Sequence, residues 1–173
     1  MLETTGKQYN QQLALLEPFA PALFAVSWAG ETSSLNWFHI AREYTKRWHH
    51  QQQIRDAVGK PGISTKELYY PVLDTFMMAL PYTYRNINAK ENTVIKTTIS
   101  GEAGGDWFLA KKENRVLNKE NNLPLTAHIT INVGIAWKLF TKSWRKNDAV
   151  NYITTEGDAA LAEPVLNMIA VMA

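Results

Sequence analysis

The side chains best suited to chemistry lie in one polar segment, residues 42–56, which reads REYTKRWHHQQQIRD and holds two of the four histidines. On an α-helix, residues four and seven positions apart share a face. Two neighbouring faces then carry imidazole, amide and acidic groups: His49, Gln53 and Asp56 on one, and His39, Glu43 and His50 on the other. The segment therefore predicts a helix that presents several ligand-type side chains toward a common site.

Metal binding is one chemistry that these side chains support. Ligands on one helix are normally one turn apart, because both must reach an ion about 2 Å away. His39 and Glu43 have that spacing, whereas Glu43 and His50 are two turns apart, roughly 10 Å along the helix. We therefore treat His49, His50 and Glu43 as candidate ligands for a divalent metal such as zinc, in a site that this helix alone does not complete.

Anion binding is a second interpretation of the same helix. Guanidinium groups beside a histidine can hold a carboxylate through charge-assisted hydrogen bonds. The candidates for such a substrate or anion site are Arg42, Arg47 and Arg55, together with His50. A third interpretation involves no chemistry: Arg42, His49 and Asp56 form a polar network inside a helical bundle, with Trp48 and Ile54 in its core.

The N-terminal half must position this helix, and its pattern is helical. Prolines 18 and 21 end a first amphipathic segment, and Gly59, Pro61 and Gly62 end the polar one. Ser64 to Glu67 has the pattern of a capping box, with a kink expected near Pro71. The predicted helices are 3–17, 33–58 and 64–80.

The C-terminal half reads differently, with β-branched strands and a glycine-rich turn at 101–105. Strands are predicted at 94–100, from Trp107 onward, at 125–132 and at 150–155, and helices at 134–142 and 157–172. The last helix carries Leu161, Val165, Ile169 and Met172 as one apolar stripe. The fold class is therefore α+β, with a helical part at 1–85, an α+β domain at 86–173, and a candidate linker at 81–92.

Composition narrows the function classes. The chain has 173 residues, 46% of them hydrophobic, which is typical of a globular protein. It has no cysteine, which excludes disulfides, zinc–thiolate sites and a cysteine nucleophile. A net charge of only +2 gives no indication of nucleic-acid binding. No signal peptide and no membrane-spanning stretch is expected, so we predict a cytoplasmic protein.

Several segments resemble a known family. The helical half is similar to the middle of mycothiol-dependent maleylpyruvate isomerase-like proteins, a DinB-related group, at residues 28–31, 36–38, 41–45 and 48–56. The other half resembles that family's sterol-carrier-protein-2-like C-terminal domain at residues 100–107, 136–141 and 157–162. The resemblance covers most of the chain, and the WHHQQQIRD run is its more specific part.

The resemblance implies a four-helix bundle with a divalent metal held by an early histidine and a later Glu-x-x-x-His pair. The metal would activate a low-molecular-weight thiol. His50 matches the later histidine, but Lys46 stands where the acid is expected, and the family's first helices have no counterpart. We therefore expect an incomplete metal site and a protein that binds a small apolar or amphipathic ligand rather than turning it over. The expected ligand pocket lies between the sheet and the last helix, near Trp107, Trp137 and Leu161.

Two alternatives remain open. The chain is a metal- and thiol-dependent isomerase or transferase if a second subunit of a homodimer supplies the missing ligand. It is a non-catalytic interaction module if its exposed aromatic residues cover a partner.

Overall fold

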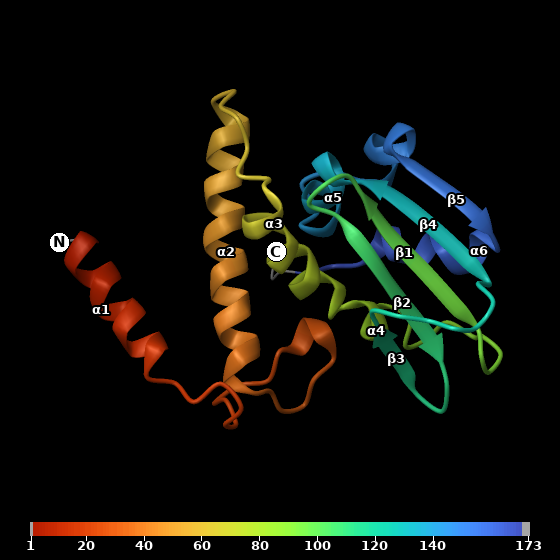
Figure 1. Ribbon diagram of the computed structural model, residues 1–173, viewed down its shortest axis with the longest axis horizontal. Helices are drawn as coiled ribbons and strands as arrows, with labels where there is room; N and C mark the ends of the chain where they lie inside the picture. Colours follow the sequence, from red (N-terminus) through yellow and green to blue (C-terminus); the bar gives the residue numbers. More distant parts are fainter. Residues whose placement is uncertain (1, 171–173) are drawn as a thin grey trace.

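A five-stranded mixed sheet forms one layer of the protein (Figure 1). The computed structural model describes residues 2–170, and side chains from residue 5 onward. The strands are β1 (Val94–Ser100), β2 (Gly105–Lys111), β3 (Arg115–Asn118), β4 (Ala127–Asn132) and β5 (Ile153–Gly157). Their order is β3-β2-β1-β4-β5, with β1 and β4 parallel and the other neighbours antiparallel. This sheet, together with the helices described in the next paragraph, confirms the predicted α+β class.

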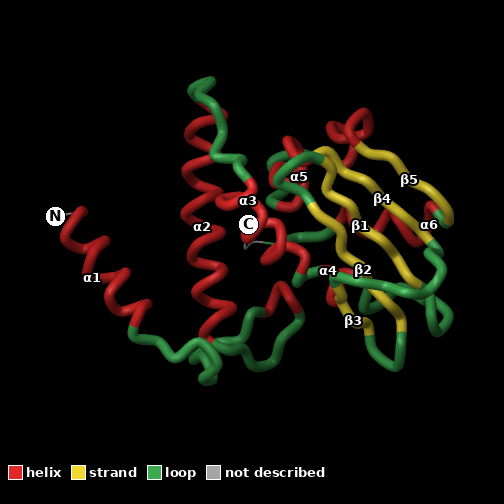
Figure 2. The backbone as a smooth tube through the Cα atoms, viewed as in Figure 1, coloured by secondary structure: helices red, strands yellow, loops and turns green. Residues whose placement is uncertain are grey.

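Helices form a second layer beside the sheet, and further helices extend beyond that layer, away from the sheet (Figures 1 and 2). The α-helices are α1 (Leu2–Ala14), α2 (Asn36–Ala57), α3 (Lys66–Met77), α4 (Leu80–Thr83), α5 (Val133–Phe140) and α6 (Ala159–Ala162). Three 3-10 helices are η1 (Ser27–Ala29), η2 (Lys146–Tyr152) and η3 (Glu163–Asn167). Helix α3 lies between α2 and the sheet, and α1 lies beyond α2 (Figure 1). No helix within residues 2–170 is long and apolar enough to cross a membrane.

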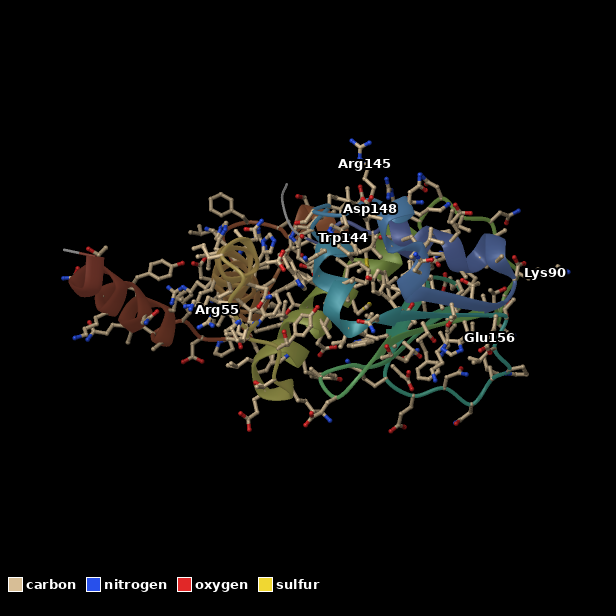
Figure 3. The ribbon with its side chains drawn as sticks, turned by 90° about the horizontal axis from the view of Figure 1, so that it is seen from above. Arg55, Lys90, Trp144, Arg145, Asp148 and Glu156 are labelled. Atoms are coloured by element: carbon tan, nitrogen blue, oxygen red, sulfur yellow. The ribbon has the colours of Figure 1, made fainter. Side chains whose placement is uncertain are left out.

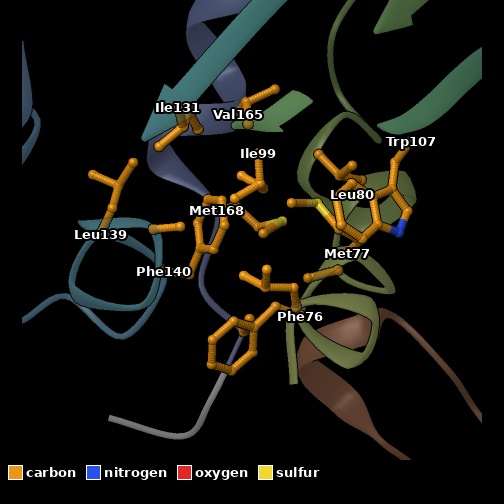
Figure 4. Close-up of a cluster of buried hydrophobic side chains, with 14 of the residues drawn as sticks. Phe76, Met77, Leu80, Ile99, Trp107, Ile131, Leu139, Phe140, Val165 and Met168 are labelled. Atoms are coloured by element: carbon orange, nitrogen blue, oxygen red, sulfur yellow. The ribbon is translucent and has the colours of Figure 1, made fainter. Parts of the chain in front are cut away.

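One hydrophobic core joins α3 and α4 to the sheet. Leu80 and Phe76 meet Ile99 and Trp107 of the strands and Phe140 of α5 in a fully buried cluster (Figure 4). The inward residues of β4 are its alternating apolar ones, as a half-buried strand requires. In β1, the buried Thr97 stands between the apolar Ile95 and Ile99 on the inward face.

The segment predicted as a linker belongs to this packed structure. Residues 81–92 contain Tyr84, which is fully buried in the core and donates a hydrogen bond from its hydroxyl to the carbonyl of Leu161 at 2.7 Å. The prediction of a free linker was therefore wrong, because a polar, proline-containing segment can still bury one large aromatic residue.

Two local predictions were also wrong, and one strand was missed. The N-cap of α3 is Thr65 and no side chain caps the helix, so the box from Ser64 to Glu67 does not form. The strand predicted from Trp107 onward is β2, and the chain turns after it into β3, which was not predicted. The last helix is divided into α6 and η3, because Pro164 lacks the amide hydrogen that a continuing α-helix needs. Met172, the end of its predicted stripe, lies outside the described residues.

Candidate functional site

A cavity of about 450 Å³ lies against α2 and contains much of the predicted chemistry. Four predicted site residues line it together: Arg42, Glu43, His49 and His50. Its other walls come from distant segments: Trp28 of η1, Thr75 of α3, Thr141 after α5, and Ala170. The helical spacing brought the α2 residues to one place, and the fold closed a cavity over them.

His49 is the half-buried group of this cavity. Its Nε2 atom is buried and has no hydrogen-bond partner among the described residues. The ring meets Trp137 edge-on with centroids 5.7 Å apart, and it lies beside the ring of His50. Burial, together with the neighbouring His50, lowers the pKa of His49 below its ordinary value of 6.5. His49 is therefore a neutral imidazole at neutral pH, with one buried ring nitrogen that lacks a hydrogen-bond partner among the described residues.

Arg42 is held in place by His39. The Nε2 atom of His39 lies 2.6 Å from the carbonyl oxygen of Phe24, so this nitrogen carries the proton and donates it. The other ring nitrogen, Nδ1, then accepts a hydrogen bond from Arg42 at 3.2 Å. Both nitrogens of His39 are thus engaged, and its function is to orient a guanidinium at the cavity.

The other two candidate arginines lie elsewhere. Arg47 donates to Asn10 of α1 at 2.7 Å and pairs with Glu43 at 3.5 Å. Arg55 donates to the carbonyl of Pro61 at 3.0 Å, beyond the end of α2. Figure 3 shows Arg55 beside α2, on the side of the molecule away from Lys90 and Glu156. Neither Arg47 nor Arg55 lines the cavity, so Arg42 is the predicted arginine that does, together with His50.

The polar network predicted for the interpretation without chemistry does not form as expected. Asp56 pairs with Lys138 of α5 at 2.7 Å rather than with His49 or Arg42. Trp48 is buried as predicted, but Ile54 is 64% exposed. The acidic end of this face therefore attaches α2 to α5 and leaves His49 without a carboxylate partner.

The metal-binding geometry is not preassembled. Within residues 2–170, no three His, Asp or Glu side chains converge as a group able to hold an ion. Glu43 is instead shared with Lys46 at 3.8 Å and with Arg47. Binding of zinc or of a thiol cofactor therefore remains a prediction.

The residues expected to form a ligand pocket in the C-terminal half are mostly packed in the core. Trp107 is fully buried, and its indole nitrogen donates to Asp74 at 2.8 Å. Trp137 is buried edge-on against Trp48, and the partly buried Leu161 packs against the core. None of these three predicted residues lines the cavity beside α2.

The threonines of the cavity wall, Thr45, Thr75 and Thr141, were not predicted as site residues. The hydroxyl of Thr75 donates to the carbonyl of Pro71 at 2.8 Å, and that of Thr141 donates to the carbonyl of Trp137 at 2.8 Å. Their oxygens therefore remain acceptors. No local pattern marks these residues, because each lies in an ordinary amphipathic segment.

No family model and no curated protein sequence matches the chain. Among solved structures, it is similar to sterol carrier protein 2 like 2 from Aedes aegypti, with 15% identity and a TM-score of 0.43 over 56% of this chain and 95% of that one. The sterol carrier protein domain 2 of Helicoverpa armigera gives 16% identity and a TM-score of 0.41 over 60% and 85%. The apo form of sterol carrier protein 2 from Yarrowia lipolytica gives 13% and 0.35 over 78% and 91%.

Proposed function

We propose that this protein binds a small amphipathic carboxylate in the cavity beside α2. The observation that carries the proposal is the pairing, in one wall, of Arg42 with a half-buried His49 whose Nε2 atom lacks a partner among the described residues. A buried polar atom without a partner costs about 1–3 kcal/mol. A ligand that supplies the partner recovers that cost.

The size of the cavity suits a small molecule. Its volume of about 450 Å³ falls in the range typical of ligand sites, which hold a few polar groups in a largely apolar wall. Here the apolar part comes from Trp28, Ala170 and the methyl groups of Thr75 and Thr141. An apolar tail would contact these groups while its carboxylate meets Arg42.

The positive charge is arranged for an anion rather than a neutral ligand. Arg42 is oriented by His39, and Lys46 also lines the cavity. Glu43 opposes this charge, but it is paired with Lys46 and Arg47. The guanidinium offers a carboxylate two parallel hydrogen bonds, which gives both affinity and direction.

Binding of hexanoate tests the proposal, with hexanol as the matched neutral probe. We expect saturable binding of hexanoate by calorimetry, accompanied by shifts of the His49 ring signals in NMR spectra. Arg42→Gln should weaken hexanoate binding about tenfold, the value of one hydrogen bond to a charged group. Arg47→Gln removes the same charge from α2 outside the cavity and should change the affinity less than about twofold.

Three outcomes contradict the proposal. They are the absence of saturable binding, equal binding of hexanol and hexanoate, and equal losses in the two arginine variants. Each would mean that the cavity does not select a carboxylate through Arg42.

A metal-dependent activity at the same cavity is the second candidate. The candidate ligands His49, His50 and Glu43 line this cavity, and His50 matches the later histidine of maleylpyruvate isomerase-like proteins. A second copy of the chain would supply the missing ligand in a homodimer. Zinc titration, followed by elemental analysis and by light scattering, tests it: one zinc per chain and a zinc-dependent dimer, both lost in His50→Ala, would favour this candidate over simple ligand binding.

A further inference from the structure

A second cavity, of about 420 Å³, lies on another part of the molecule. It is bordered by η1 and the glycine after it, by the end of α4, and by the β2–β3 turn. It shares no lining residue with the cavity beside α2. Three cationic side chains from three elements line it, Arg85, Lys111 and Arg115, against one acid, Glu113.

Arg115 is the partly buried cation of this group. Its Nε donates to the carbonyl of Tyr84 at 2.8 Å, and its Nη2 donates to the carbonyl of Ile87. Its Nη1 atom is buried and has no hydrogen-bond partner within the described part of the chain. Burial lowers the pKa of Arg115, and the neighbouring Tyr84 opposes this shift.

The other two cations are held near the same space by local contacts. Arg85 donates to the carbonyl of Tyr82 at 2.9 Å and lies over the ring of that tyrosine, 3.9 Å from its centre. Lys111 donates to the backbone carbonyl of Glu113 at 2.9 Å, so the Glu113 carboxylate is not its partner in that bond. None of the three cations forms an ion pair with an acid of residues 2–170, although Glu113 lies close by.

Gly30 allows the remaining wall to close. It has a left-handed backbone conformation, with φ of 79°, and a Cβ at this position would lie 2.4 Å from the Tyr82 ring. Only glycine lets the backbone come this close to Tyr82. The result is a small cavity with an excess of positive charge.

We propose that this second cavity is a binding site for a phosphate-type oxyanion. Guanidinium groups suit this class because their planar array of donors matches phosphate oxygens, and a lysine adds a point charge. The unpartnered Nη1 of Arg115 gains a partner when such an anion is bound. The chemistry is that of a phosphate group, either free in solution or carried by a lipid headgroup.

Titration of the full chain with inorganic phosphate, followed by ¹H–¹⁵N NMR, tests this site. We expect saturable shifts at Gly30, at the backbone amides of 111–115 and at the Arg115 side-chain Nε–H. Lys111→Gln and Arg85→Gln should each raise the dissociation constant at least about threefold. Lys112→Gln is the matched control: it removes the same charge one residue away, and Lys112 does not line the cavity.

These variants are preferable to one at Arg115, since loss of Arg115 would also release the carbonyls of Tyr84 and Ile87. Non-saturable shifts, or an equal effect of Lys112→Gln and Lys111→Gln, would overturn the proposal and indicate diffuse charge attraction only.

A second experiment, with lipid vesicles, distinguishes a phosphate carried by a lipid headgroup from a phosphate free in solution. If the wild-type protein, but not Lys111→Gln, binds phosphatidylcholine vesicles that contain phosphatidic acid, the ligand is a lipid headgroup. If the protein binds free phosphate saturably but does not bind the vesicles, the ligand is a soluble phosphate.

Discussion

The hydroxyl of Tyr69 accepts a hydrogen bond from the backbone amide of Trp137 at 3.0 Å and donates one to the carbonyl of Val133 at 3.2 Å. These two backbone groups are four residues apart, in the first turn of α5. The hydroxyl of Tyr69 thus bridges that turn from α3. The Tyr69 ring also stacks on Trp48 with centroids 4.5 Å apart, so one side chain joins α2, α3 and α5.

Tyr69→Phe should destabilise the protein by about 1.5 kcal/mol, because it removes a buried hydroxyl and leaves a buried amide without this partner. Urea denaturation measures the loss. The control is Tyr152→Phe, at an exposed tyrosine, which should change the free energy of unfolding by less than about 0.5 kcal/mol. Equal effects of the two substitutions would contradict the bridging function assigned to Tyr69.

Gly104 lies where no side chain fits. A Cβ there would lie 1.8 Å from the carbonyl oxygen of Ile99, a backbone atom that cannot move aside without disturbing β1. We expect Gly104→Ala to cost about 2 kcal/mol or more. Gly6→Ala is the matched change, because nothing lies within 4 Å of that position in α1, and it should be neutral or slightly stabilising. Thermal unfolding of both variants checks this; a tolerated Gly104→Ala would show that the turn is built differently.

His49 should make stability depend on pH. Its pKa is lowered in the folded protein, so between 6.5 and that lower value the unfolded chain binds more protons. Stability is therefore complete above about pH 6.5 and falls as the pH drops through this window. Urea midpoints at about pH 7.5 and pH 5 measure the fall. His49→Gln should reduce it, whereas His50→Gln, at an exposed position, should retain most of it.

A bound carboxylate should reverse that shift. A negative charge beside His49 favours the imidazolium, so saturation with hexanoate should raise the pKa of His49. By linkage, hexanoate should bind more tightly at about pH 6 than at pH 7.5. NMR titration of the His49 ring with and without hexanoate measures the pKa directly. A pKa that stays unchanged at saturation would place the ligand away from His49.

Much of the local structure follows from the sequence because it depends on neighbouring residues. The helix predicted at 33–58 is α2, which spans Asn36–Ala57. It ends there because Gly59 and Pro61 follow within four residues of its last residue. The strand predicted at 94–100 is β1, with its apolar side chains inward. Spacing also brought Arg42, Glu43, His49 and His50 to one cavity wall.

Other features depend on segments that meet only in the folded chain. The register between β2 and β3 made a strand of Arg115–Asn118, whose sequence, RVLN, does not alternate between polar and apolar residues. Core packing placed Trp107 against Asp74, far from any cavity beside α2. Thr75, Thr141 and Ala170 close that cavity from separate elements.

The sequence by itself thus determined which side chains share a face of α2, because helical periodicity acts over four residues. Only the tertiary structure decided what those side chains face. Asp56 pairs with Lys138 rather than with His49, and Arg47 turns to Asn10 of α1. The surroundings of His49 are a product of the same long-range packing, because Asp56 pairs with Lys138, 82 residues away along the chain, and the ring of Trp137 packs against that of His49.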